Sequence, residues 1–161
     1  MTKSNTKSKK GFTIIEVVLV LAIAGLIFLM VFVALPALQR SQRDTQRRDD
    51  VARVSTAITQ YQSNNKGNLP NDASRFIENY LRVGGDEFAD PSGNEYEIDI
   101  LEGSGEARND YASGDYTITI YTGAVCDEEA ATASNRSRDY AVVYKLEGSG
   151  SYCVGSSNAD N

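Results

Sequence analysis

A long apolar stretch lies close to the start of this chain and limits the structures that the chain can form. Residues 17–35 contain no charged residue and no polar side chain. Because a helix rises about 1.5 Å per residue, roughly 20 apolar residues cross the 30 Å hydrocarbon core of a bilayer. The stretch therefore predicts a membrane-spanning helix.

Glu16 immediately precedes this stretch, where a carboxylate is expensive to place in lipid. It is a defect in a simple anchor, a pore residue or half of a bond to another molecule. The segment before it is basic, because Lys3, Lys7, Lys9 and Lys10 stand among residues 1–11 without an acidic residue. A cleaved secretory signal with a small-residue site at residues 22–24 is an alternative, but it would leave a strongly apolar mature end.

The rest of the chain is acidic and poor in catalytic residue types. The whole chain has a net charge of −6, and without its four leader lysines 12 basic residues face 22 acidic ones, a net −10. This balance argues against general affinity for nucleic-acid backbone. The chain has no histidine, so the commonest general base and zinc ligand is missing. We therefore expect no enzyme, no cofactor and no metal site.

Two acidic runs and one short motif are weighed against that expectation. Residues 86–99 and 127–129 offer oxygen ligands for calcium but follow no EF-hand loop, and solvated acidic loops are the simpler interpretation. Residues 84–90, "GGDEFAD", contain the letters of a cyclic-dinucleotide synthase signature, whose domain is much larger than this chain. We interpret that match as coincidence.

The two cysteines, Cys126 and Cys153, both lie late in the chain. They lack the clustered spacing of a metal site, so one disulfide is the simpler interpretation if this part of the chain is exported. Two buried free thiols are the alternative.

A second helical pattern follows the apolar stretch. Val51, Val54, Ile58 and Tyr61 recur at three- and four-residue steps, which places an apolar stripe on one face. Residues 12 to about 65 therefore predict one long helix, loosened near Pro36. Its second half needs a partner to cover the stripe.

The remainder supplies that partner. A short helix is expected after an N-cap at Asn71 or Asp72, and strands are expected at residues 96–101, 116–121 and 140–146, with a last short strand after them. The predicted fold class is α+β, with a long N-terminal helix, transmembrane and then amphipathic, packed on a small antiparallel sheet.

The start of the chain resembles the class III signal of type IV pilins and pseudopilins. The residues that carry the resemblance are Lys9, Lys10, Gly11, Phe12, Thr13, Ile14, Ile15 and Glu16, followed by the apolar helix. The resemblance is specific over residues 7–40. It implies that a prepilin peptidase cleaves after Gly11, that the new amine of Phe12 is methylated, and that Glu16 faces the amino terminus of a neighbouring subunit during assembly.

The resemblance also implies an organisation and a function. Residues 1–11 are a cleaved leader, 12–38 a transmembrane and filament-core helix, 39–66 an amphipathic helix, and 67–161 the αβ-loop and sheet of an exported domain. The function is that of a pilus subunit, with a pseudopilin of a type II-like secretion system or a non-polymerising anchored surface protein as alternatives.

The expected partners and location follow from that function. The partners are other pilin subunits, the prepilin peptidase, an inner-membrane assembly platform and membrane lipid, with nucleic acid only through pilus-mediated DNA uptake. The expected location is the cytoplasmic membrane, crossed once with the C-terminal domain outside, and then a surface pilus or an envelope pseudopilus.

Overall fold

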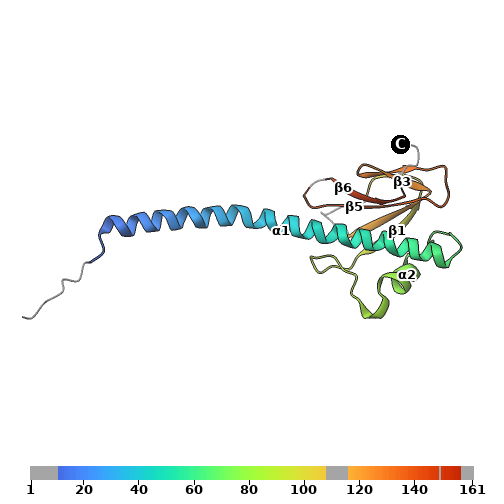
Figure 1. The fold of residues 1–161 in the computed structure, drawn as a ribbon, viewed down its shortest axis with the longest axis horizontal. Helices are drawn as coiled ribbons and strands as arrows, with labels where there is room; N and C mark the ends of the chain where they lie inside the picture. The colour runs from blue at the N-terminus through green and yellow to red at the C-terminus, as the bar shows by residue number, and fades with distance from the viewer. Residues whose placement is uncertain (1–10, 108–115, 149, 157–161) are drawn as a thin grey trace, which may run out of the picture. The chain divides into compact units, whose positions relative to one another are not determined.

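The computed structural model describes residues 11–107, 116–148 and 150–156 (Figure 1). By internal contacts the chain forms two units, residues 1–39 and residues 40–161. The first unit contributes the apolar part of a long helix. The second contains the rest of that helix together with every described strand.

The long helix α1, Ile14–Asn64, confirms the expected single helix. Pro36 lies inside it without ending it. In the second unit the predicted stripe is buried, since Val51, Val54 and Ile58 are at most 1% exposed. The helix ends where the side-chain amide of Asn65 donates to the Tyr61 carbonyl at 2.9 Å and Gly67 adopts a positive φ of 85°, a conformation that glycine tolerates at helix ends.

The short helix expected next begins as predicted but continues in a different winding. Asp72 caps α2, Ala73–Phe76, by accepting a hydrogen bond from the Arg75 amide at 3.1 Å. The helix then widens into a π-helical turn, η1, Ile77–Leu81, and a 3₁₀ turn, η2, Val83–Gly85, follows. Phe76 and Leu81 are buried against α1 and the sheet.

The main sheet has four strands in the order β1-β2-β5-β6. The strands are β1 Glu97–Glu102, β2 Thr117–Thr122, β5 Tyr140–Lys145 and β6 Ser151–Gly155. The expectation of an antiparallel sheet is correct for β2, β5 and β6 but wrong for β1, which pairs in parallel with β2. Residues 103–116 separate these two strands, which is long enough for the crossover that a parallel pair requires.

A hairpin that was not predicted from the sequence covers the second face of this sheet. It consists of β3, Ala124–Asp127, and β4, Ala130–Ala133. Ala124 and Ala131 of the hairpin pack with Tyr121, Ala141 and Val143 of the sheet. The sheet is therefore buried on both faces, and Thr119, on the face of β2 away from α1, is fully buried.

The main core lies between α1 and the other face of the sheet. The α1 stripe packs there against apolar side chains of three strands, namely Ile98, Ile118, Ile120, Val142 and Tyr144. Figure 1 shows the strands beside the second half of α1. The sheet thus covers the apolar stripe of the amphipathic half of the helix. Burial of each such side chain contributes about 1.5–3 kcal/mol to the stability of the fold.

Candidate functional site

The predicted cleavage junction lies immediately ahead of α1. Gly11 and Phe12 are in non-helical chain, and the Phe12 side chain is 90% exposed. A Cβ atom built on Gly11 would meet no other atom within 4 Å. The fold of this chain therefore does not require glycine at position 11, so any requirement for glycine has to come from a molecule that acts on it.

Glu16 takes part in a capping box at the start of α1. Its Oε2 atom accepts hydrogen bonds from the Thr13 amide at 3.0 Å and from the Thr13 hydroxyl at 2.9 Å, while the Glu16 amide donates back to the Thr13 hydroxyl at 3.4 Å. The pattern Thr-x-x-Glu before an apolar run is the sequence signal for such a box, although it was not among the predictions above. Within the described residues, no hydrogen bond reaches the second carboxylate oxygen, Oε1.

The apolar side chains that follow Glu16 are exposed. Every large apolar residue from Val17 to Val33 is at least 48% exposed, including Phe28 and Phe32. Among the described residues, α1 is the helix long and apolar enough to cross a membrane, and none of that window is buried. With the motif reported below, this supports anchoring through a single N-terminal helix.

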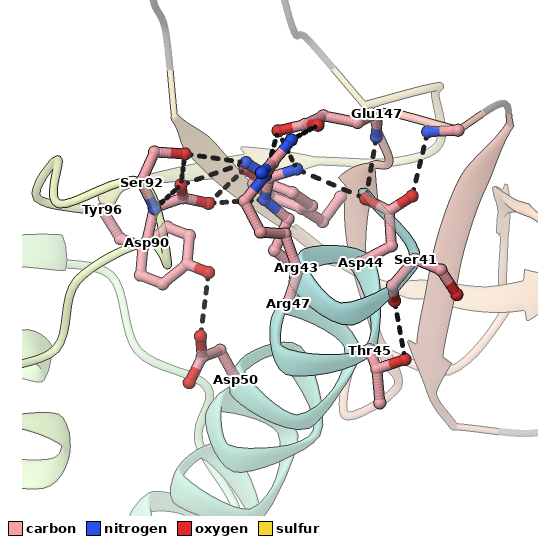
Figure 2. A network of polar contacts seen from close by, with 12 residues as sticks. Ser41, Arg43, Asp44, Thr45, Arg47, Asp50, Asp90, Ser92, Tyr96 and Glu147 are labelled. Atoms are coloured by element: carbon pink, nitrogen blue, oxygen red, sulfur yellow. Dashed lines mark hydrogen bonds and ion pairs between the residues drawn. The ribbon is translucent and has the colours of Figure 1, made fainter. Parts of the chain in front are cut away.

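A buried ion-pair network lies in the second unit, centred on Arg47 (Figure 2). The Arg47 side chain is 1% exposed and that of Asp90 is fully buried. Arg47 donates through Nε to Asp90 Oδ2 at 2.6 Å and through Nη2 to Asp90 Oδ1 at 3.0 Å. This two-bond geometry is the strong form of an arginine–carboxylate pair.

The network also holds the turn between β5 and β6. Glu147 in that turn pairs with Arg47 at 2.9 Å and with Arg43 at 2.6 Å. Asp44 lies three residues before Arg47 on α1. It accepts hydrogen bonds from the amides of Glu147 and Gly148 at 3.0 and 2.9 Å. The first two turns of α1 in this unit thus bind two loops that are far apart in the sequence.

The same contacts set the ionisation of the network. Burial acts to raise the pKa of Asp90, but the hydrogen bonds from Arg47 and Ser92 outweigh it and leave that pKa lowered. The hydrogen bond from Arg43 is the main cause of the lowered pKa of Glu147. Both carboxylates are therefore charged at neutral pH. Nearby, burial raises the pKa of Asp50, which accepts a 2.9 Å hydrogen bond from Tyr96.

The acidic residues of the two runs do not gather into a metal site in the described part of the chain. In the run at residues 86–99, Asp86, Asp90 and Glu95 each pair with a different arginine. In the second run, Glu129 accepts a hydrogen bond from the Ser151 amide at 3.2 Å. These contacts give several of the acids roles inside the fold.

The two cysteines are brought together from β3 and β6. Cys126 and Cys153 form a disulfide, with 5.7 Å between their Cα atoms. Both cysteines pack against the small second core formed by the β3–β4 hairpin and the sheet. The bond therefore ties the hairpin to the edge strand of the sheet.

We expect the disulfide to stabilise this part of the domain. It closes a loop with a sequence separation of 27 residues, for which chain entropy gives about 3.5 kcal/mol. Cys153→Ser should lower the melting temperature and expose β6 to protease. Thiol titration of the denatured, unreduced wild-type protein should find no free thiol. Two free thiols per chain would contradict the prediction.

Comparison with known proteins identifies the N-terminal segment. Residues 6–32 match the family described as the prokaryotic N-terminal methylation motif. No curated protein and no solved structure matches the chain. The match contains Gly11, Phe12 and Glu16 and ends within the exposed apolar helix. The resemblance to the class III signal of type IV pilins is thus confirmed, and the chain carries the N-terminal methylation motif of pilin-like precursors.

Proposed function

We propose that this protein is the precursor of a structural subunit of a type IV pilus-like filament. The observation that carries the proposal is the N-terminal methylation motif running into a helix whose apolar side chains are exposed, continuous with a folded domain. In this proposal a prepilin peptidase removes residues 1–11, and the amine of Phe12 becomes the methylated N-terminus.

The apolar helix has two successive environments in this proposal. Before assembly, residues 12–38 lie in the bilayer, which covers the exposed side chains. After extraction, the same side chains pack against neighbouring helices in the filament core. Water is excluded in both environments, so a helix that is apolar on all sides is stable in each.

Glu16 sets the register between neighbouring subunits. The capping box occupies Oε2 and leaves Oε1 without a hydrogen bond within the described residues. That oxygen can accept a hydrogen bond from the amino group of a neighbouring subunit's Phe12 without breaking the capping box. A charged pair in an apolar setting favours the one stagger that brings both partners together.

The domain that follows residue 39 remains outside the membrane and coats the filament. The disulfide between Cys126 and Cys153 supports an oxidising environment for it. The buried network around Arg47 supports a rigid connection of α1 to the loops that surround it, because each loop is held by charged hydrogen bonds.

We expect Gly11→Leu to block processing while leaving the fold intact. A Cβ atom at this position would contact no atom within 4 Å beyond the neighbouring residues, whereas a peptidase has to bring its catalytic groups against the backbone there. Uncleaved precursor should accumulate in membranes, seen as a larger band on a denaturing gel. Normal processing of Gly11→Leu would contradict the assignment of this junction.

Electron microscopy of sheared surface material tests the proposed function. Antibody against the domain should label fibres from wild-type cells and no fibres from cells that lack the gene. Labelled structures confined to the envelope would instead indicate a secretion pseudopilus. Protein that stays dispersed in the membrane, under conditions where processing is complete, would contradict a filament role.

A further inference from the structure

A hollow of about 500 Å³ opens between the last turns of α1 and the segment formed by α2 and η1. Four side-chain amides face it, together with two tyrosines and one arginine. We call it the amide pocket. Its lining residues are Gln60, Asn64, Asn65, Asn79, Tyr61, Tyr80 and Arg75, together with the exposed apolar residue Val83. Its volume lies within the range of small-molecule sites, roughly 300–1,000 Å³. It lies within the second unit.

The lining is unusual for this chain. The protein has 22 acidic residues and a net charge of −6, yet none of the described residues that line the amide pocket is acidic. Each amide offers two donor hydrogens and an acceptor oxygen, and each tyrosine hydroxyl offers both functions. The amide pocket therefore presents many paired donors and acceptors with little charge.

Part of this hydrogen-bonding capacity is free. The Asn65 amide is engaged, because it donates to the Tyr61 carbonyl at 2.9 Å. The Asn64 amide nitrogen only approaches the Tyr80 hydroxyl at 3.4 Å, which is longer than an ordinary N–H···O bond. The Asn79 amide donates to the Arg75 carbonyl at 2.8 Å, which leaves its acceptor oxygen available. Gln60 makes no side-chain hydrogen bond within the described residues.

An aromatic cluster makes one wall of the amide pocket rigid. Tyr80 stacks on the buried ring of Phe76 with centroids 5.8 Å apart, and Tyr61 lies 5.2 Å from Tyr80. The π-helical turn η1 carries Asn79 and Tyr80, and such turns occur frequently at functional sites. Fixed tyrosines give a ligand apolar contact and a hydroxyl at small conformational cost.

We propose that the amide pocket binds a pyranose sugar. A pyranose has apolar C–H faces, which suit the tyrosine rings, and adjacent hydroxyl groups that donate and accept at once, which suit the amides. A nucleotide or acidic peptide would need more positive charge than Arg75 supplies, and Arg75 already pairs with Asp72 at 3.4 Å. On an assembled filament, this site would attach the fibre to surface carbohydrate.

The test uses the full chain in detergent micelles, so that it does not depend on filament assembly. The protein is applied to an array of neutral hexoses, N-acetylhexosamines and uronic acids, and the sugar with the strongest signal is titrated in solution. We expect millimolar or tighter binding that weakens about tenfold in the Asn64→Ala, Asn79→Ala double variant, which loses at least two hydrogen bonds to the sugar.

Two further variants separate a sugar site from a folding defect. Gln60→Ala removes an exposed amide that has no partner in the described structure, so it should weaken binding without changing thermal unfolding. Asn94→Ala removes an exposed amide outside the amide pocket and should leave binding unchanged. Absence of binding to every sugar class at millimolar concentration would overturn the proposal. Equal binding by wild type and the double variant would also overturn it.

Discussion

Replacing Glu16 with valine is expected to reduce filament assembly strongly without preventing membrane insertion or cleavage. The substitution removes the carboxylate that would pair with a neighbour's amino terminus, and it makes residence in lipid easier. Subunits should accumulate in the membrane in processed form. The yield of sheared filaments should fall by about tenfold or more, measured against membrane-bound subunit on the same immunoblot.

Glu16→Gln is the matched control for this variant, because Glu16 has two separable contacts. Glutamine can keep the capping box with Thr13, since Gln and Glu both serve at this helix position. It cannot form a charged pair with an amine. If charge sets the register, Glu16→Gln should fail to assemble as Glu16→Val does. Assembly by Glu16→Gln at wild-type yield would assign the role of Glu16 to helix capping and contradict the register hypothesis.

Arg47→Met is expected to be the most damaging substitution in the folded domain. It leaves the Asp90 carboxylate buried without its arginine and removes one of the ion pairs that hold the turn containing Glu147. Breaking a buried ion pair by removing one partner costs about 3–5 kcal/mol, against a total stability of roughly 5–15 kcal/mol. Near-ultraviolet circular dichroism of the full chain in micelles should show a melting temperature at least about 10 °C lower.

Arg75→Met is the control for a surface ion pair. Arg75 also pairs with an aspartate, Asp72, but its side chain is 84% exposed, so the change should be within about 0.5 kcal/mol. Equal destabilisation by the two variants would contradict a special role for the buried network.

Acidic pH should reduce the difference in melting temperature between wild type and Arg47→Met. The lowered pKa values of Asp90 and Glu147 stabilise wild type above the ordinary carboxyl pKa, and this contribution is lost as pH falls through the lowered values. In Arg47→Met, burial of Asp90 without its arginine raises the pKa of this carboxyl group. Protonation of Asp90 at acidic pH then removes the buried unpaired charge that destabilises the variant. The gap in melting temperature should therefore narrow below about pH 5. A gap that widens on acidification would contradict this assignment of charges.

The elements with strong local signals could be predicted from the sequence. The apolar stretch and the stripe of Val51, Val54 and Ile58 define α1, and the alternation at residues 116–121 defines β2. The β3–β4 hairpin was missed because its strands, "AVCD" and "AATA", are short and have little alternation. Its place over the second face of the sheet depends on tertiary contacts and on the disulfide.

The buried network could not be predicted, because its members are distant in the sequence. Arg47 and Asp90 are 43 residues apart, and Asp44 and Glu147 are 103 apart. Each looks like an ordinary surface charge until the fold brings them together. The parallel pairing of β1 with β2 was not predicted for a similar reason, since the residues of each strand alone do not fix the direction in which it pairs. The capping box at Thr13 and Glu16, by contrast, was readable from spacing alone.

The identity of the mature N-terminus is the sharpest test of the proposal that this protein is a processed pilin-like subunit. Protein purified from membranes or sheared fibres is digested, and its N-terminal peptide is identified by mass spectrometry. We predict that the chain begins at Phe12 and carries a methyl group on its amine, because the resemblance to the class III signal implies cleavage after Gly11 and both residues lie within the matched residues 6–32. Mature protein that begins at Met1, or near Gly25 after cleavage as a secretory signal, would contradict processing as a pilin-like precursor.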